Sequence, residues 1–208
     1  KFVYFSTDEV FGPAPEGVFY KEDDRYRSGN PYAATKAGAE ELCVAYENTY
    51  KMPILITHTM NVFGLRQHPE KFIPLIIKRI RDGELIQVHA NTNKTKAGSR
   101  HYIHATDVAS AVLFLLDRGQ SGEKYNVAGH IETDNEELVQ TIADIMNKDA
   151  NYELVDFHSS RPGHDLRYAL CSDKMKNLGW MPSKNLRERL EEVVNWSLEN
   201  NQWLGDKG

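Results

Sequence analysis

Short apolar runs alternate along the chain with longer segments of helical periodicity, and this alternation limits the possible folds more than any other feature. The apolar runs are FVYF (2–5), ILITHT (54–59), LIQVH (85–89) and KYNVA (124–128), and helices are expected at about 31–50, 70–81 and 107–117. Strands that recur between helices of ten or more residues are typical of βαβ units in a parallel sheet. The sequence therefore predicts an α/β fold of the Rossmann-like kind.

Residues that begin and end helices lie at these boundaries. Pro31 suits a first helical turn, and Gly83 and Gly119 suit positions just past helix ends. The segment TDNE (133–136) has the pattern of a capping box before LVQTIADIM. The first helix is expected to turn small and apolar residues toward the sheet, namely Ala34, Gly38, Leu42 and Ala45.

The pattern changes in the last third of the chain. This part contains one strand candidate (YELV), then a short helix near 172–178, and then an amphipathic C-terminal helix from Leu186. We expect residues 1–130 to form the sheet domain and residues 131–208 to form mainly a small α/β lobe beside it, with the two parts interleaving.

Charge and composition exclude several classes of protein. The net charge of −5 is spread over interleaved signs, so no basic face for nucleic acid is expected. No apolar run approaches the roughly 20 residues of a membrane helix. Cys43 and Cys171 lie far apart and are interpreted as buried thiols in a reducing compartment, which favours a cytoplasmic protein. No metal site is predicted. Because the chain starts with Lys1 inside a strand pattern, we expect an N-terminal part to be missing.

Polar residues follow the first two strands. STDE (6–9) comes directly after FVYF, and Asn61 follows ILITHT. In open parallel sheets ligands bind at the carboxyl ends of the strands. Adjacent carboxylates, Asp8 and Glu9, at such an edge are candidates for chemistry, and the alternative is an ordinary turn or helix cap.

Tyr32 and Lys36 lie four residues apart at the start of the first predicted helix. Residues i and i+4 share a helix face, so an ammonium there can lower the pKa of the phenol and make it a usable base. A Tyr and a Lys at this spacing are common by chance. The position of this pair, after a strand and the STDE segment, gives it weight.

Seven segments in order carry a family resemblance: STDEVFG, NPYAATKAGAE, MNVFG, HPEKFIPLII, YNVAGHIE, RPGHDLRYAL and LGWMP. Over essentially its whole length the chain resembles the nucleotide-sugar 4,6-dehydratases, typified by dTDP-glucose 4,6-dehydratase, of the extended short-chain dehydrogenase/reductase superfamily. The Thr-Asp-Glu triplet is the most specific segment, because epimerases and decarboxylases of the superfamily usually differ at the Asp.

The resemblance implies an NAD-dependent reaction on a nucleotide-activated glucose. A tyrosinate at Tyr32 takes the proton of the sugar 4-hydroxyl while a hydride leaves C4 for NAD. Glu9 then removes the C5 proton, and Asp8 protonates the departing C6 hydroxyl. Thr7 hydrogen-bonds near the 4-oxygen, and Lys36 also holds the nicotinamide ribose.

The resemblance also implies the binding residues. For NAD these are Ser6, Tyr32, Lys36 and Asn61. For the nucleotide-diphosphate sugar they are Thr7, Asn61, Lys71, Arg100, Asn126, Arg161 and His164. Arginines suit a pyrophosphate because the guanidinium donates bidentate hydrogen bonds. By family, residues 1–130 are the second half of a NAD-binding domain, 131–208 are mainly the substrate lobe, and a homodimer forms through helices including the one with Tyr32.

The chain departs from the family pattern in places. It contains no Gly-x-Gly-x-x-Gly, so on its own it is expected to be inactive and not to bind NAD productively. Val62 stands where many dehydratases carry a second Asn, and His101 stands where Asp is usual. Three alternatives stay open: a UDP-glucose 4,6-dehydratase, a UDP-glucuronate decarboxylase or 4-epimerase, and a non-catalytic fragment.

Overall fold

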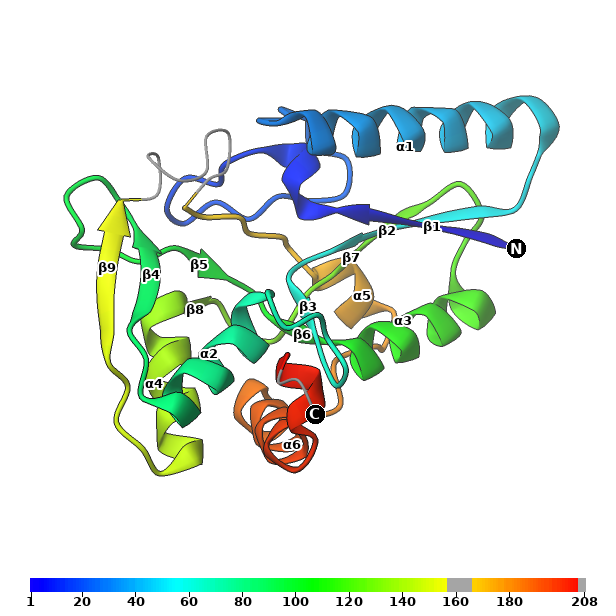
Figure 1. The fold of residues 1–208 in the computed structure, drawn as a ribbon. Coiled ribbons are helices and arrows are strands. Elements are labelled where there is room, and N and C mark those ends of the chain that lie inside the picture. Colours follow the sequence, from blue (N-terminus) through cyan, green and yellow to red (C-terminus); the bar gives the residue numbers. More distant parts are fainter. Residues whose placement is uncertain (157–165, 206–208) are drawn as a thin grey trace.

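The central layer of the protein is a three-stranded parallel sheet. We describe a computed structural model of residues 1–156 and 166–205. The strands β1 (Phe2–Thr7), β2 (Ile54–Thr59) and β7 (Lys124–Val127) lie in the order β1-β2-β7. Helix α1 (Pro31–Tyr50) covers one face of this sheet and α3 (Ala105–Arg118) the other (Figure 1). The predicted α/β class with a parallel sheet is confirmed.

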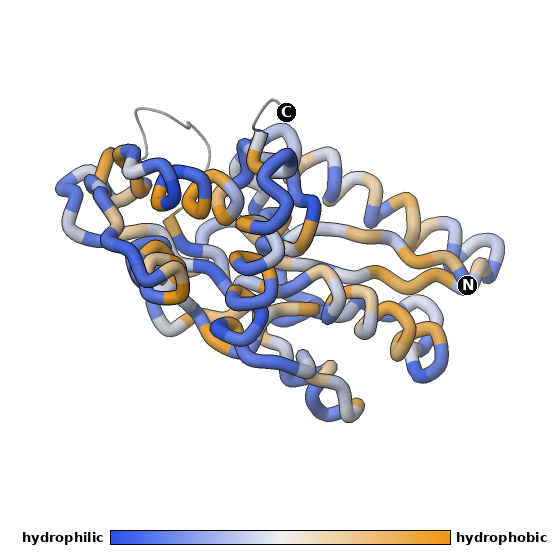
Figure 2. Tube along the Cα trace, turned by 60° about the horizontal axis from the view of Figure 1, so that its bottom comes forward, coloured by the Kyte–Doolittle hydropathy of each residue, from blue (hydrophilic) through white to orange (hydrophobic). Residues whose placement is uncertain are grey.

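Apolar side chains of the strands build the core between these layers. Leu55 of β2 and Tyr125 of β7 are almost fully buried and pack against Leu115 of α3. Hydrophobic residues are concentrated along the strands beside the N-terminus (Figure 2). Burial of this surface supplies the main favourable free energy of folding.

Helix α1 has its predicted bounds but turns a different face to the sheet. It begins after Asn30, whose side chain accepts a hydrogen bond from the backbone N–H of Ala33. Its buried residues are Ala33, Glu40 and Cys43, whereas Leu42 is 62% exposed. The predicted inward stripe, Ala34, Gly38, Leu42 and Ala45, is therefore wrong. The helix is turned so that the carboxylate of Glu40 faces the sheet, where strand residues satisfy it.

A second, smaller sheet lies apart from the first. Strand β4 (Ile86–Ala90) pairs in parallel with β9 (Tyr152–Asp156), more than 60 residues further along. Helices and a 3-10 helix pack around this pair with a shared apolar core: α2 (Phe72–Asp82), α4 (Asn135–Met146), α6 (Leu186–Glu199) and η2 (Asn201–Leu204). The alternation of the sequence gives no sign that the run near 85–89 leaves the central sheet, because its partner is remote.

Short elements connect the two sheets. Strand β3 (Val62–Phe63) pairs with β6 (Ile103–His104), and β5 (Ser99–Arg100) pairs with β8 (Thr133–Asp134). Helix α5 (Asp173–Asn177) packs against β7. We call the part around β4 and β9, with α2, α4 and α6, the lobe.

Two predictions at helix ends have different outcomes. Gly83 and Gly119 directly follow α2 and α3, as expected. The capping box at Thr133 is wrong, because the buried hydroxyl of Thr133 has no hydrogen-bond partner among the described residues. The cap of α4 is Asp134, which accepts a hydrogen bond from the N–H of Glu137 at 2.8 Å.

A buried ion pair joins the central domain to the lobe. Arg189 of α6 donates two hydrogen bonds of 2.8 Å to the carboxylate of Asp107 on α3. The exposed fractions of these residues are only 8% and 2%. Burial alone raises the pKa of Asp107, but the hydrogen bonds from Arg189 and Ser183 outweigh burial and leave the pKa below its usual value.

Other expectations concern cysteines, metals and membranes. Cys43 is buried and Cys171 is partly buried, and both are free thiols. Within 1–156 and 166–205 no group of three or more His, Cys, Asp or Glu side chains is arranged to hold a metal ion. In the same ranges no helix has the length and hydropathy of a membrane span.

Candidate active site

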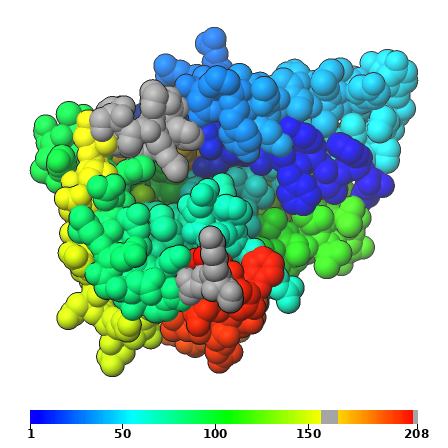
Figure 3. Space-filling view, viewed as in Figure 1, coloured from blue at the N-terminus to red at the C-terminus, as the bar shows by residue number. Residues whose placement is uncertain are grey.

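A cleft of about 660 Å³ opens where β1 and β2 end and faces the lobe. The N-terminal segment (blue) lies above the segment of α2 (green) on this side of the molecule (Figure 3), and residues of both line the cleft. Eight of the residues predicted from the sequence line the cleft: Ser6, Thr7, Asp8, Glu9, Tyr32, Asn61, Lys71 and Arg100. The fold therefore brings together positions that are up to 94 residues apart in the sequence.

The hydroxyl of Thr7 hydrogen-bonds to both of the acidic residues that follow it. Strand β1 ends at Thr7, and a 3-10 helix, η1 (Asp8–Phe11), begins there. Thr7 Oγ1 accepts from the backbone N–H of Glu9 at 3.3 Å and donates to Oδ1 of Asp8 at 3.0 Å. Asp8 is buried and Glu9 half-buried. The two neighbouring acids thus experience different surroundings.

Asp8 holds its proton more tightly than an ordinary aspartate. Burial raises the pKa of Asp8 from 3.8 to about 6, with a further contribution from Glu9, against the lowering effect of Arg100 and of the Thr7 hydrogen bond. Its Oδ2 has no hydrogen-bond partner among the described residues. A buried carboxyl with one unpartnered oxygen at a cleft wall can deliver a proton near neutral pH.

Asn30 holds the carboxylate of Glu9. Its Nδ2 donates to Oε2 of Glu9 at 2.8 Å, while its Oδ1 accepts from the N–H of Ala33 at 2.8 Å. The same side chain therefore caps α1 and orients Glu9. The sequence reasoning used Pro31 at this helix start and missed Asn30, although Asn before Pro is a strong cap signal.

The backbone around Gly12 explains why the segment STDEVFG ends in glycine. Gly12 has φ of 76°, and its N–H donates to the carbonyl of Glu9 at 3.1 Å. An added Cβ would lie 2.5 Å from the carbonyl oxygen of Arg27, whose N–H in turn donates to Val10. Only glycine fits this turn without displacing the backbone.

Tyr32 and Lys36 occupy different places on the first turns of α1. Tyr32 is 53% exposed and lines the cleft. The Lys36 ammonium donates to the carbonyl of Phe5 at 2.5 Å and lies 4.4 Å above the ring of Tyr4, at the outer edge of β1. A joint catalytic role for the two residues stays a prediction.

Lys71 and Arg100 add positive charge to the cleft. Lys71 lies at the start of α2. Arg100 donates to the carbonyls of Ser99 and Leu166 at 2.6 and 2.5 Å, and its guanidinium lies 4.6 Å above the ring of Tyr168. Further lining residues that the sequence reasoning missed are Gln67, Arg79, Gln87, His89, Tyr102 and Tyr168. Only Gln87 and His89 carried a signal, the alternation of polar and apolar residues in LIQVH.

The structure does not bring Asn126 to the cleft. Its side chain is fully buried in β7. Nδ2 donates to the carbonyls of Tyr20 and Cys171 at 2.9 and 3.0 Å, and Oδ1 faces Nδ1 of His58 at 2.9 Å. Because the whole amide is used inside the protein, the expectation of a substrate contact is corrected to a structural role. Arg161 and His164 lie outside the described residues.

A parallel sheet with Thr-Asp-Glu at its mouth and a tyrosine on the adjoining helix defines a nucleotide-sugar dehydratase of the short-chain dehydrogenase/reductase class. The comparisons agree with this geometry. The chain belongs to the family described as GDP-mannose 4,6 dehydratase, whose family model matches residues 1–193.

Individual relatives point to the same group. The chain is 38% identical to the low-salt glycan biosynthesis protein Agl12 of Haloferax volcanii over 97% of its length and 63% of that protein. It is 35% identical to a dTDP-glucose 4,6-dehydratase of Escherichia coli over 98% of this chain and 60% of that protein. The dTDP-glucose 4,6-dehydratase of Bacillus anthracis, solved with NAD, has a TM-score of 0.89 at 33% identity and covers 99% of this chain and 64% of its own. The chain thus spans about three fifths of the length of the relatives it matches.

Proposed function

We propose that this protein catalyses the NAD-dependent dehydration of dTDP-glucose to dTDP-4-keto-6-deoxyglucose, as a lyase of deoxysugar biosynthesis. The observation that carries the proposal is the unlike environment of two adjacent carboxylates. Asp8 is buried, with its pKa raised to about 6, and Glu9 is held by an amide donor. Elimination across neighbouring carbons needs one acid and one base at the same time.

Each catalytic group has a separate task. Tyr32 takes the proton of the 4-hydroxyl. The hydroxyl of Thr7, which donates to Asp8 in the structure, turns its proton toward the 4-oxygen when the sugar binds. The 4-keto group makes the C5 proton acidic, and Glu9 removes this proton and gives it back to C5 when the hydride returns to C6. Asp8 gives its proton to the C6 hydroxyl, which leaves as water. Asn30 keeps the carboxylate of Glu9 oriented for this step.

The residues of this chain fit the nicotinamide end of NAD. When bound, NAD accepts the hydride from C4 and returns it to C6. Ser6, Tyr32 and Asn61 line the cleft at the ends of β1 and β2, and Lys36 lies at the adjacent edge of β1. A phenol, an amide and an ammonium are suitable donors for a ribose and a carboxamide, and the hydroxyl oxygen of Ser6, whose proton goes to Glu40, can accept. The chain has no glycine-rich motif for the pyrophosphate.

The lobe side of the cleft suits the nucleotide diphosphate. Arg100 and Lys71 provide positive charge to this cleft, and Asn61, which lines the same cleft, is assigned to the sugar. Arg161 and His164 are proposed for the same ligand on the RPGH motif alone. We assign dTDP rather than UDP because the E. coli and B. anthracis relatives are dTDP-glucose dehydratases.

The proposal includes the organisation of the whole enzyme. Residues 1–130 supply the catalytic half and 131–208 most of the substrate lobe. A homodimer through α1 is supported by the outer face of that helix, where Leu42, Tyr46 and Tyr50 are 62%, 49% and 69% exposed. Two free thiols are consistent with a cytoplasmic enzyme.

Product analysis tests the proposed reaction. The full-length natural protein is incubated with NAD and either dTDP-glucose or UDP-glucose, and the products are identified by mass and NMR. A product that has lost one water, with a methyl group at C6, is expected, faster from dTDP-glucose. A product that keeps its 6-hydroxyl refutes dehydration and favours a 4-epimerase, and a faster reaction of UDP-glucose reassigns the nucleotide.

A further inference from the structure

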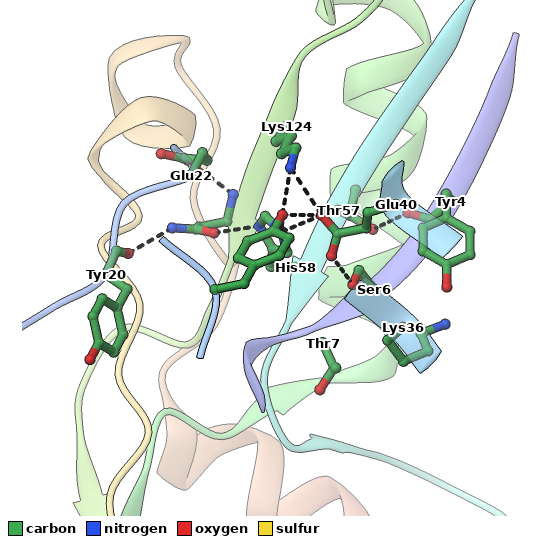
Figure 4. A network of polar contacts seen from close by, with 12 residues as sticks. Tyr4, Ser6, Thr7, Tyr20, Glu22, Lys36, Glu40, Thr57, His58 and Lys124 are labelled. Atoms are coloured by element: carbon green, nitrogen blue, oxygen red, sulfur yellow. Dashed lines mark hydrogen bonds and ion pairs between the residues drawn. The ribbon is translucent and has the colours of Figure 1, made fainter. Parts of the chain in front are cut away.

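A group of polar side chains lies buried between α1 and the central sheet (Figure 4). At its centre is Glu40, whose side chain is fully buried, as is that of His58. The Ser6 hydroxyl donates to Oε1 of Glu40, and the Tyr26 hydroxyl donates to Oε2. Nε2 of His58 and the ammonium of Lys124 each lie 3.2 Å from Oε2. We call these five residues the Glu40 network.

The network continues onto β7 in a fixed orientation. The amide of Asn126 donates from Nδ2 to two backbone carbonyls, so its Oδ1 must face His58. Nδ1 of His58 therefore carries a proton and donates to that oxygen. Because every member is hydrogen-bonded, the network holds one arrangement of α1, β1, β2 and β7.

The network favours the ionised form of Glu40. Burial by itself raises the pKa of Glu40, but the hydrogen bonds from His58, Ser6 and Tyr26 outweigh burial and bring it to about 2. A buried carboxylate is costly unless it is paired. The proposed reaction does not use this carboxylate, so its place in the fold needs another explanation.

The position of Glu40 relates it to the catalytic groups. It lies one helical turn after Lys36 and two turns after Tyr32 on the same side of α1. Ser6, its partner on β1, directly precedes Thr7, and Lys36 donates to the carbonyl of Phe5. Two successive residues of β1 are thus tied to the tyrosine-bearing helix just before the catalytic triplet.

The structure assigns to Glu40 the role of a positioning residue: it sets the register of α1 against β1 and β2 and so places Tyr32 relative to Asp8 and Glu9. This inference rests on the proposed function. One residue of slip along a helix moves a side chain by about 1.5 Å. A displacement of about 1 Å in an active site can cost about 100-fold in rate.

The test uses graded variants in the full-length protein with NAD and dTDP-glucose. Tyr26→Phe removes one donor but keeps the ring against Phe11, 5.2 Å away. Glu40→Gln removes the charge. Glu41→Gln is the matched control, because Glu41 is exposed on the same helical turn.

We expect kcat to fall about 5-fold in Tyr26→Phe and about 100-fold in Glu40→Gln, with KM within about 3-fold, as for lost positioning. The pH values at which kcat rises and falls stay the same, since no titrating catalytic group is removed. Glu41→Gln keeps the wild-type kcat. A kcat per folded molecule within about 2-fold of wild type in Glu40→Gln overturns the proposal. If Glu40→Gln does not fold, an unchanged kcat in Tyr26→Phe overturns it.

Hydrogen exchange separates this inference from the proposed function. Loss of the network is expected to speed amide exchange in 7–11 and 32–36 and to leave α6 unchanged. If the wild type gives no dehydrated product, the proposed function is refuted. The hydrogen exchange of the variants then still tests whether Glu40 positions α1. If the wild type is active and both kcat and exchange are unchanged in the variants, the positioning role alone fails.

Discussion

Replacing Asp8 with asparagine should stabilise the protein at neutral pH. The pKa of Asp8 is about 6 in the folded protein and 3.8 in its usual state. Because the folded value is the higher one, the stability linked to this proton is complete below about pH 3.8 and is lost as the pH rises through about 6. At about 1.36 kcal/mol per pKa unit, ionisation of Asp8 costs about 3 kcal/mol above pH 7.

Asp8→Asn removes that cost and keeps an oxygen that can accept from Thr7. Urea unfolding of the variant and the wild type from pH 4 to 8 measures the difference in the free energy of unfolding. The difference should be near zero at pH 4 and rise to about 3 kcal/mol at pH 8, or about 6 to 12 °C in Tm. The exposed Asp149→Asn serves as control. A difference that does not change with pH would refute the reasoning. Dehydration by Asp8→Asn should be lost at every pH.

Three further predictions concern a cap, a turn and an ion pair. Asn30→Ser and Asn30→Ala should both lower kcat/KM about 10-fold, because both remove the donor to Glu9. In calorimetry only Asn30→Ala should lose about 1 kcal/mol of unfolding free energy, because Ser still caps the helix. Gly12→Ala should cost more than about 2 kcal/mol in denaturant unfolding, whereas Gly17→Ala, with the same φ of 76° and open space around it, should cost about 1; equal costs would contradict the clash. Asp107→Asn should cost about 3 kcal/mol in the same assay, and a neutral result would mean that its buried arginine partner finds other acceptors.

Local patterns predicted the elements of this fold well, and their faces less well. The bounds of α1 at 31–50 follow from Pro31 and helical periodicity. Its inward face was mistaken because small residues such as Gly38 suggest close packing, whereas the partners of Glu40 on β1 and β2 lie 34 and 18 residues away. Periodicity cannot show that a carboxylate has donors far away in the sequence. The pairing of β4 with β9 was not predicted for the same reason, because the two strands are also far apart in the sequence.

The candidate site shows a similar division. The motifs correctly predicted that one cleft contains Thr7, Asp8, Glu9 and Tyr32. The reason is that the carboxyl ends of neighbouring strands and the start of the adjoining helix converge. The buried state of Asp8 depends on residues from the rest of the chain, and no local pattern reveals it. The prediction for Asn126 was wrong because a motif gives a position in the sequence and not the surroundings of the side chain. The amide of Asn126 is hydrogen-bonded to the backbone carbonyls of Tyr20 and Cys171.

The pairing of β4 with β9 has a consequence for recombination among related genes. The segment between them, which holds α3 and β7, returns to the central sheet before the lobe is completed. A single crossover in that segment would join β4 from one parent to β9 from another and create a mismatched sheet and core. Exchange of the lobe alone needs crossovers at the boundaries of three separate segments, which hold α2 with β4, α4 with β9, and α6, so substrate specificity in such proteins should diverge by point substitution more readily than by shuffling.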